Sequence, residues 1–171
     1  MKLAPAVFAL AAIAAGCASM TAGGPTAVAR LAPTAGNSTS GTVTFAQTGD
    51  KVAVTAKVSG LSPGPHGFHI HEKGDCSASD AASAGGHFNP TGKPHGNPQA
   101  GDHHSGDMPV LEADSSGNAT LSTTLDGIAI GAGAGDIVGK SVVVHKDPDD
   151  YKTQPAGNSG ARIACGVIAK A

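Results

Sequence analysis

The sequence predicts an all-β domain, a Greek-key β-sandwich or barrel of about eight antiparallel strands. Three observations lead to this prediction. Short runs of alternating apolar and polar residues are separated by turn residues, no amphipathic helical period of useful length is found, and two loops interrupt the strands. The composition agrees, because only 3% of the residues are aromatic and the apolar residues are mainly small or β-branched. A chain of 171 residues can bury one sizeable core, so we expect one domain.

The first three predicted strands precede the histidine-rich part of the chain. They cover residues 26–32, 41–47 and 51–61, with a TGD turn between the second and the third. In the third run the alternate residues are apolar and share one face, as expected for a half-buried strand. These residues are Val52, Val54, Ala56 and Val58.

A fourth strand is predicted at residues 66–72, and the strand pattern stops after it. Residues 73–111 show neither a helical nor a strand period and are rich in Gly, Pro, Ser, Asp and His. So long a loop in a compact domain is usually functional or disordered. Strands resume at residues 118–125, 140–145 and 162–169, and a second, shorter loop joins the last two.

Residues 1–16 predict an export signal. One charge, Lys2, precedes a run of small apolar residues that is too short to span a bilayer. The run ends in AAGCAS, which is typical of a bacterial lipoprotein signal, so we expect lipidation of Cys17 and a location in the bacterial periplasm or cell envelope. The alternative is an ordinary cleaved secretory signal that lies near a cysteine. Residues 17–25 are expected to form a tether, and residues 26–171 the folded domain.

The net charge of the chain limits the kinds of partner that we expect it to bind. The net charge is −2 and no cluster of Lys or Arg is found, so a nucleic-acid partner is not expected. The lipid at Cys17 is the only membrane contact we expect.

Lipidation of Cys17 leaves Cys76 and Cys165 as the only internal cysteine pair, and an exported location favours a disulfide between them. Such a crosslink closes a long loop and is expected to stabilise the fold by about 2–5 kcal/mol.

The histidines indicate a metal site. His69 and His71 are two residues apart on a predicted strand, so both side chains leave the same face and can converge on one ion. His66 is three residues from His69 and points the other way on a regular strand. Five more histidines follow, four of them in or beside the long loop: His87, His95, His103, His104 and His145.

Clustered histidines with a nearby carboxylate, Asp107, match the ligands of zinc and copper. The alternatives are ordinary surface histidines, a pH sensor and a nonspecific histidine-rich metal binder. The histidines are dispersed one or two per motif, each among its own turn residues, which disfavours the nonspecific binder.

Six motifs make the interpretation specific: HGFHIHEKGDC, GGHFNP, KPHG, HSGD, VVVHKDPDD and GNSGARIACGVIA. In this order and context the chain resembles the copper/zinc superoxide dismutases from about Thr26 to its C-terminus. The resemblance implies conversion of superoxide to dioxygen and hydrogen peroxide with one copper and one zinc per chain. The implied copper ligands are His69, His71, His87 and His145. The implied zinc ligands are His87, His95, His104 and Asp107, so that His87 bridges the two metals.

The resemblance also implies supporting roles. Asp149 corresponds to a carboxylate that links a copper ligand, His69, to a zinc ligand, His95. His66 corresponds to a histidine that braces loops by hydrogen bonding. Arg162 corresponds to the arginine that attracts and positions the anionic substrate. His87 is also implied in catalysis, as the residue that takes up a proton and delivers it to the peroxide, whereas His103 has no counterpart role.

The loop between the last two strands departs from the family pattern. It is shorter than in the eukaryotic enzymes, and only Lys152 and Arg162 remain positive there, so we expect electrostatic steering to be weaker or to come from another part of the molecule. Ala156 stands where the channel wall usually carries a threonine. A non-catalytic copper-binding or copper-delivery lipoprotein is the alternative function, although it needs neither the zinc ligands nor Arg162. Both a monomer and a homodimer are compatible with the sequence.

Overall fold

The regular structure of residues 23–171, the part of the chain described by the computed structural model, consists of nine β-strands and one short 3₁₀ helix. The predicted signal and the lipidation site at Cys17 lie outside the described residues. The elements are β1 (Thr26–Pro33), β2 (Ser40–Thr48), β3 (Lys51–Ser59), β4 (Gly64–His66), β5 (Phe68–His71), η1 (Ala82–Ala84), β6 (Leu111–Ala113), β7 (Ala119–Leu125), β8 (Ser141–His145) and β9 (Arg162–Lys170). The all-β prediction is confirmed, and residues 23–171 contain no helix long and apolar enough to cross a membrane.

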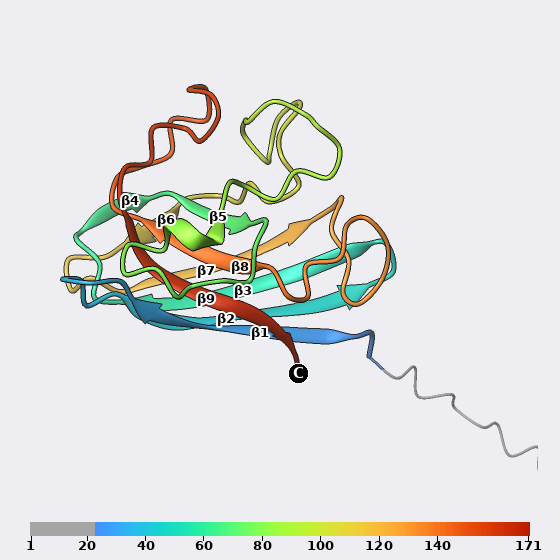
Figure 1. Cartoon of the computed structure of the whole chain (residues 1–171), viewed down its shortest axis with the longest axis horizontal. Coiled ribbons are helices and arrows are strands. Elements are labelled where there is room, and N and C mark those ends of the chain that lie inside the picture. The colour runs from blue at the N-terminus through green and yellow to red at the C-terminus, as the bar shows by residue number, and fades with distance from the viewer. Residues whose placement is uncertain (1–22) are drawn as a thin grey trace, which may run out of the picture.

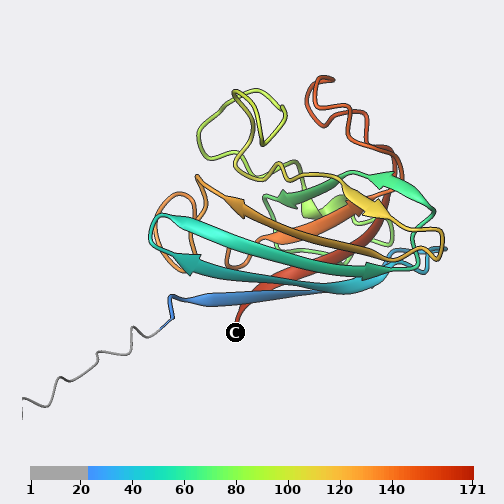
Figure 2. The same ribbon diagram turned by 180° about the vertical axis from the view of Figure 1, so that it is seen from behind.

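Seven strands form one antiparallel sheet in the order β5-β8-β9-β1-β2-β3-β7, and β4 pairs with β6 in a second sheet. The last strand, β9, lies between β1 and β8, so the first and last strands of the domain are neighbours. Figures 1 and 2 show that the large sheet curls, with β5 and β8 lying over β3 and β7. Apolar side chains from both ends of the sheet meet in one core.

Two details differ from the sequence prediction. The strand expected at residues 66–72 is interrupted at Gly67, whose N–H donates to the carbonyl of Asp147 at 2.9 Å and whose carbonyl accepts from His145 N at 2.8 Å. The short strand β6 has no counterpart among the predicted strands, because three residues are too few to show an alternation. The turn between β2 and β3 agrees with its sequence: Gly49 has a φ of 62°, which glycine adopts without strain.

The alternation of side chains decides what faces the core. Phe68 and Ile70 of β5 enter the main core. The side chains of His69 and His71 therefore leave the opposite face of the strand. That face is covered as well, since all four residues of β5 are buried. Strand β8 behaves in the same way, because Val142 and Val144 enter the main core while Val143 packs in a smaller cluster with Cys165 on the other side.

Two long loops, residues 72–110 and 146–161, stand on the same side of the sheet (Figures 1 and 2). A disulfide joins Cys76, near the start of the first loop, to Cys165 on β9, with an S–S distance of 2.04 Å and a sequence separation of 89. The predicted disulfide is therefore confirmed. The disulfide ties the first loop to β9, the strand that follows the second loop.

Candidate metal centre

The outer face of β5 supplies the first two candidate ligands. His69 and His71 follow the alternation of the strand and lie beneath the two loops, where they are 0% and 1% exposed. Imidazoles are rarely removed from water so completely without partners for their nitrogen atoms. Their burial therefore requires partners from the loops.

The long loop brings two more ligands to β5 through backbone hydrogen bonds. The N–H of Ile70 donates to the carbonyl of Gly106, and the carbonyl of Ile70 accepts from Phe88 N, both at 2.8 Å. This pairing sets His87 opposite His71 and Asp107 opposite His69. Gly106 is needed here, because a Cβ at this position would collide with the carbonyl oxygen of Ile70.

The end of β8 supplies a further histidine. His145 follows an irregularity in the pairing of β8 with β9, a position at which a strand re-aims its side chains. Its N–H donates to the carbonyl of Gly67 at 2.8 Å, which places it beside β5. A Cβ at Gly67 would lie 2.6 Å from Ser159 Oγ, so only glycine allows the second loop to approach this closely.

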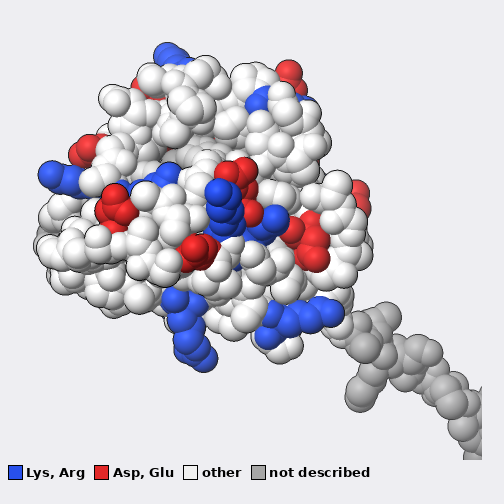
Figure 3. Space-filling model, viewed as in Figure 1, with Lys and Arg blue, Asp and Glu red and all other residues white. Residues whose placement is uncertain are grey.

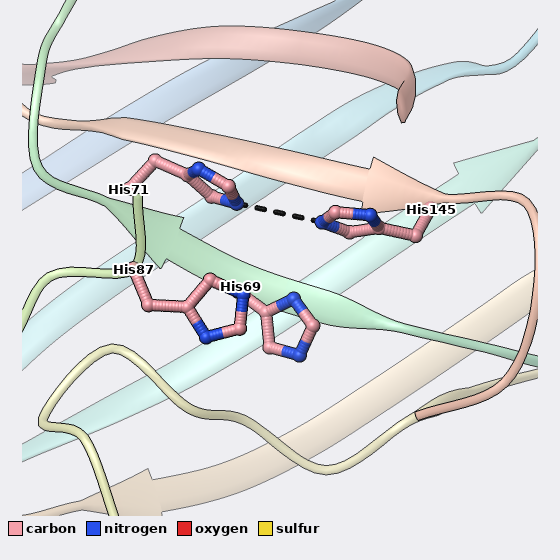
Figure 4. A group of neighbouring side chains, drawn as sticks. All are labelled: His69, His71, His87 and His145. Carbon is pink, nitrogen blue, oxygen red and sulfur yellow. Dashed lines mark hydrogen bonds between the residues drawn. The ribbon is translucent and has the colours of Figure 1, made fainter. Parts of the chain in front are cut away.

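The sequence-predicted ligands converge in two groups. Within each group one donor atom from every residue lies within 4.8 Å of the others, and all the residues are buried. His87 belongs to both groups. Figure 4 shows the side chains of the first group. The first group is His69, His71, His87 and His145, and the second is His87, His95, His104 and Asp107.

The hydrogen bonds decide which nitrogen atoms of the first group are free. His71 Nδ1 donates to the carbonyl of Gly85 at 2.9 Å, and His145 Nδ1 lies 3.3 Å from the carbonyl of Gly160. Because the protons are then on Nδ1, each Nε2 carries a lone pair, and these two Nε2 atoms lie 3.4 Å apart, as the dashed line in Figure 4 marks. Two lone pairs that face each other in a buried site are stabilised by a cation between them.

Three other nitrogen atoms are buried without a hydrogen-bond partner: His69 Nδ1, His87 Nε2 and His95 Nδ1. Leaving such groups unpaired in the interior is costly unless a metal ion accepts their lone pairs. Four imidazole nitrogens in the first group suit copper, and three nitrogens with one carboxylate oxygen in the second suit zinc. The residues present therefore fit both metals.

Asp107 is the carboxylate of the second group. Its Oδ1 lies 2.8 Å from His87 Nδ1, 3.0 Å from His95 Nδ1 and 3.4 Å from His104 Nδ1. Its Oδ2 accepts hydrogen bonds from the backbone N–H groups of His104 at 2.9 Å and Gly96 at 3.1 Å. One oxygen is thus held by the loop, while the other faces the three histidines.

Asp149 connects the two groups. Its Oδ2 accepts from His69 Nε2 at 2.7 Å, and its Oδ1 accepts from His95 Nε2 at 2.9 Å. Each of these histidines therefore donates a proton to Asp149 and turns its Nδ1 toward its own group. Asp149 comes from the second loop and is buried, so this loop orients ligands from β5 and from the first loop.

Burial keeps three histidines of the first group neutral. It lowers the pKa of His69 to about 4 and that of His145 to about 3, and it also lowers the pKa of His71. At neutral pH these rings hold no second proton. Their lone pairs are therefore available to a metal ion, which binds only the deprotonated nitrogen.

Within the second group, the surroundings of His95 favour a positive charge on its ring. Burial lowers the pKa of His95, but the neighbouring carboxylates of Asp107 and Asp149 outweigh burial and raise this pKa to about 9. Burial raises the pKa of both carboxyl groups, but their bonds with the histidines outweigh it and hold both well below the usual range. Two carboxylates around one ring stabilise a cation there, whether it is a proton or a metal ion.

A pocket of about 350 Å³ opens onto the first group. His71, His87, His145 and Arg162 are among the residues that line it, together with Ala156 from the second loop. The guanidinium of Arg162 is held by two backbone carbonyls: Nη1 donates to Ala81 O and Nη2 to Gly85 O, each at 2.7 Å.

The other residues predicted from the sequence lie around this centre. His66 is buried, and its Nδ1 donates to the carbonyl of His145 at 2.8 Å. His103 lies outside both ligand groups, with its Nδ1 2.7 Å from the carbonyl of His104. Lys152 is exposed on the second loop. Figure 3 shows acidic and basic side chains interspersed on one face of the molecule, without a continuous basic area on that face.

Two contributors could not be identified from the sequence. The carbonyl of Gly85 accepts hydrogen bonds from both His71 and Arg162, and the side chain of Gln154 bonds to both backbone groups of His95. A carbonyl is present in every residue, and a single glutamine in a loop has no distinguishing pattern. Only the arrangement of the loops reveals either role.

Known proteins share this sequence and fold. The family model described as copper/zinc superoxide dismutase matches residues 39–168. The chain is 44% identical over 135 residues to the Cu-Zn superoxide dismutase 2 of Brassica juncea, covering 75% of this chain and 88% of that protein. It is 42% identical over 134 residues to the extracellular Cu-Zn superoxide dismutase of Caenorhabditis elegans, covering 75% of this chain and 60% of that protein.

Among solved structures, the clock protein EA4 is similar, with a TM-score of 0.76 and 38% identity over 84% of this chain and 93% of that one. The family match spans most of the described domain, from before β2 almost to the end of β9. It includes both groups of converging ligands. The chain therefore belongs to the copper/zinc superoxide dismutase family.

Proposed function

We propose that this chain converts superoxide to dioxygen and hydrogen peroxide at a copper ion next to a zinc ion. One observation carries the proposal: two buried ligand groups share His87, and the first of them opens onto a pocket whose wall includes Arg162. The family relationship supports the same activity, and copper and zinc are the cofactors that it implies.

We assign copper to the four-histidine group and zinc to the group that contains Asp107. Copper, when bound, supplies a one-electron redox couple, whereas zinc does no redox work. The position of His87 between the groups supports its role as the ligand common to both. Asp149 supports both sites by holding His69 and His95 in the tautomers that direct Nδ1 toward the ions.

Arg162 is proposed to attract and position the superoxide anion. Its charge lies on the wall of the pocket, and the carbonyls of Ala81 and Gly85 hold its guanidinium in place. These two contacts use only part of the five-donor fork of an arginine, so N–H groups remain for an anion. A small anion needs a narrow pocket and a positive field, not a large cavity.

His87 is proposed to move the proton that the product requires. Its Nε2 is buried without a hydrogen-bond partner and belongs to a ring that lines the pocket, whereas its Nδ1 faces Asp107. While it is not bound to a metal ion, Nε2 can therefore hold a proton and deliver it to peroxide in the pocket. Ala156 and Pro155 form the part of the wall that belongs to the second loop.

The competing function is a non-catalytic copper-binding or copper-delivery protein. It is tested with purified protein loaded with one copper and one zinc per chain, which should remove superoxide, while His145→Ala prepared in the same way should have lost this activity. Metal analysis before the assay shows whether the wild type is fully loaded. If the fully loaded wild type is inactive, the enzymatic function is wrong and the binding function is favoured.

We further propose that the protein is exported and anchored by a lipid at Cys17 in a bacterial cell envelope. Support comes from the pattern of residues 1–17 and from the disulfide, which persists in oxidising compartments. A relative described as extracellular also supports export.

A further inference from the structure

Gln154 forms hydrogen bonds with both backbone groups of His95. Its Oε1 accepts a hydrogen bond from His95 N at 2.9 Å, and its Nε2 donates one to His95 O at 2.8 Å. One side-chain amide thus pairs with both backbone groups of a buried residue 59 positions away. Within residues 23–171, neither of these backbone groups bonds to another backbone group. Gln154 therefore provides the pairing that a neighbouring strand provides in a sheet.

The ring of His95 is held by the same loop. Asp149 accepts from Nε2 at 2.9 Å, and Nδ1 then lies 3.0 Å from Asp107 Oδ1. Asp149 sets the direction of the ring, whereas Gln154 sets the position of the backbone from which the ring extends. A metal ligand needs both, because metal–ligand distances vary by only about 0.2 Å.

The segment that makes both contacts is closed on itself. Gly157 N donates to the carbonyl of Thr153 at 2.7 Å, and Asp150 N donates to the carbonyl of Gly157 at 2.9 Å. Asp150 Oδ1 also accepts from Thr153 N at 2.8 Å. Residues 149–157 therefore form one unit, from which two side chains reach the same histidine.

We propose that Gln154 is a positioning residue that sets the zinc affinity of the second group by holding His95. This rests on the proposed assignment of zinc to that group. Gln154 is exposed, so water can replace its hydrogen bonds when the side chain is truncated, and the fold loses little stability. Water does not keep the backbone of His95 in one place, so the ion is released more readily. Loss of a partner that orients a metal ligand lowers affinity by about 10–100-fold, and we expect about tenfold.

The experiment compares Gln154→Ala with Gln99→Ala. Gln99 is an exposed residue of the first loop whose side chain makes no hydrogen bond in the described part of the chain. Metal-free full-length protein is titrated with Co²⁺, a spectroscopic stand-in for zinc, and the visible absorption of the tetrahedral ion is followed; zinc affinity is then measured by displacement. Gln154→Ala should bind both ions about tenfold more weakly than the wild type, and Gln99→Ala should match the wild type.

Thermal unfolding of the metal-free proteins separates positioning from general stability. We expect the midpoint for Gln154→Ala to lie within about 2 °C of the wild type. A weaker affinity that is accompanied by a clearly lower midpoint would show a merely structural role and overturn the proposal. Gln154→Glu keeps the acceptor for His95 N but sets an oxygen against His95 O, so it should bind zinc no better than Gln154→Ala.

Failure of the proposal and failure of the proposed function give different results. If the wild type binds Co²⁺ tightly and Gln154→Ala binds it equally well, only the role of Gln154 is wrong. If the wild type gives no tetrahedral Co²⁺ spectrum, the zinc assignment is wrong and the role of Gln154 falls with it.

Discussion

Asp149 accepts a hydrogen bond of 2.7 Å from His69 Nε2, although the two residues are 80 positions apart and both are buried. The other oxygen of the same carboxylate accepts from His95 Nε2. This single side chain therefore connects the strand β5 and the long loop through the second loop. It fixes which nitrogen of each ring faces its ligand group, and the first prediction concerns its loss.

Replacing Asp149 by Asn should weaken metal binding by about 10–100-fold, because the amide offers one acceptor where the carboxylate offers two. The copper and zinc that remain after dialysis against a chelator are measured by mass spectrometry. Asp150→Asn is the matched control, since Asp150 is exposed and bonds within its own turn. Equal retention of both metals in Asp149→Asn and the wild type would show that the link is dispensable.

Replacing Arg162 by Ala should lower kcat/KM for superoxide by about tenfold at low ionic strength, because a positive charge at the pocket concentrates and orients the anion. Added salt should reduce the difference from the wild type. Arg30→Ala, which removes an exposed charge on β1, is the control for net charge. Superoxide decay is measured at several salt concentrations, and the role of Arg162 is wrong if both variants lose activity to the same extent.

Removal of the disulfide in a Cys76→Ser/Cys165→Ser variant should destabilise the metal-free protein by about 2–5 kcal/mol, measured by urea unfolding. The loss should also lower activity in the metal-loaded protein, since the crosslinked loop carries the Ala81 and Gly85 carbonyls that hold Arg162. Wild type treated with a reductant should behave like the variant. Full activity at unchanged metal content would show that other contacts keep these carbonyls in place.

Removal of the metals should lower the melting temperature, because ions that bind only the folded state stabilise it. The gain is about 4 kcal/mol when the free ion is at 1,000 times its dissociation constant. Calorimetry of metal-free protein with zinc or copper added separately measures each contribution. Acidification should reverse the gain, since protons compete for the same nitrogen atoms. A melting temperature that does not respond to either ion would contradict both assignments.

Replacing Cys17 by Ser should move the protein from the membrane fraction to the aqueous fraction of a bacterial expression host, because the proposed lipid is attached to that thiol. Detergent phase separation followed by mass measurement of the N-terminal peptide tests this. A wild type that already partitions into the aqueous phase would favour the ordinary secretory signal.

The strands were predictable because their pattern is local. Phe68, His69, Ile70 and His71 alternate between the core and the outer face, and this alternation alone places the two histidines together. A three-residue strand such as β6 carries no such pattern. The function and the roles of individual ligands came from the resemblance of the motifs to a family, since periodicity does not distinguish copper from zinc.

By itself, the sequence determined the alternating strands, the glycine turn between β2 and β3, the types of donor side chain available and the only cysteine pair within residues 23–171. The tertiary structure alone decided which nitrogen of each histidine faces its ligand group. That choice depends on where the other nitrogen finds its partner, and the partners are distant in sequence: the carbonyls of Gly85 and Gly160, and the carboxylate of Asp149. The loops that carry them have no period, so their positions follow from backbone hydrogen bonds, close glycine contacts and the disulfide.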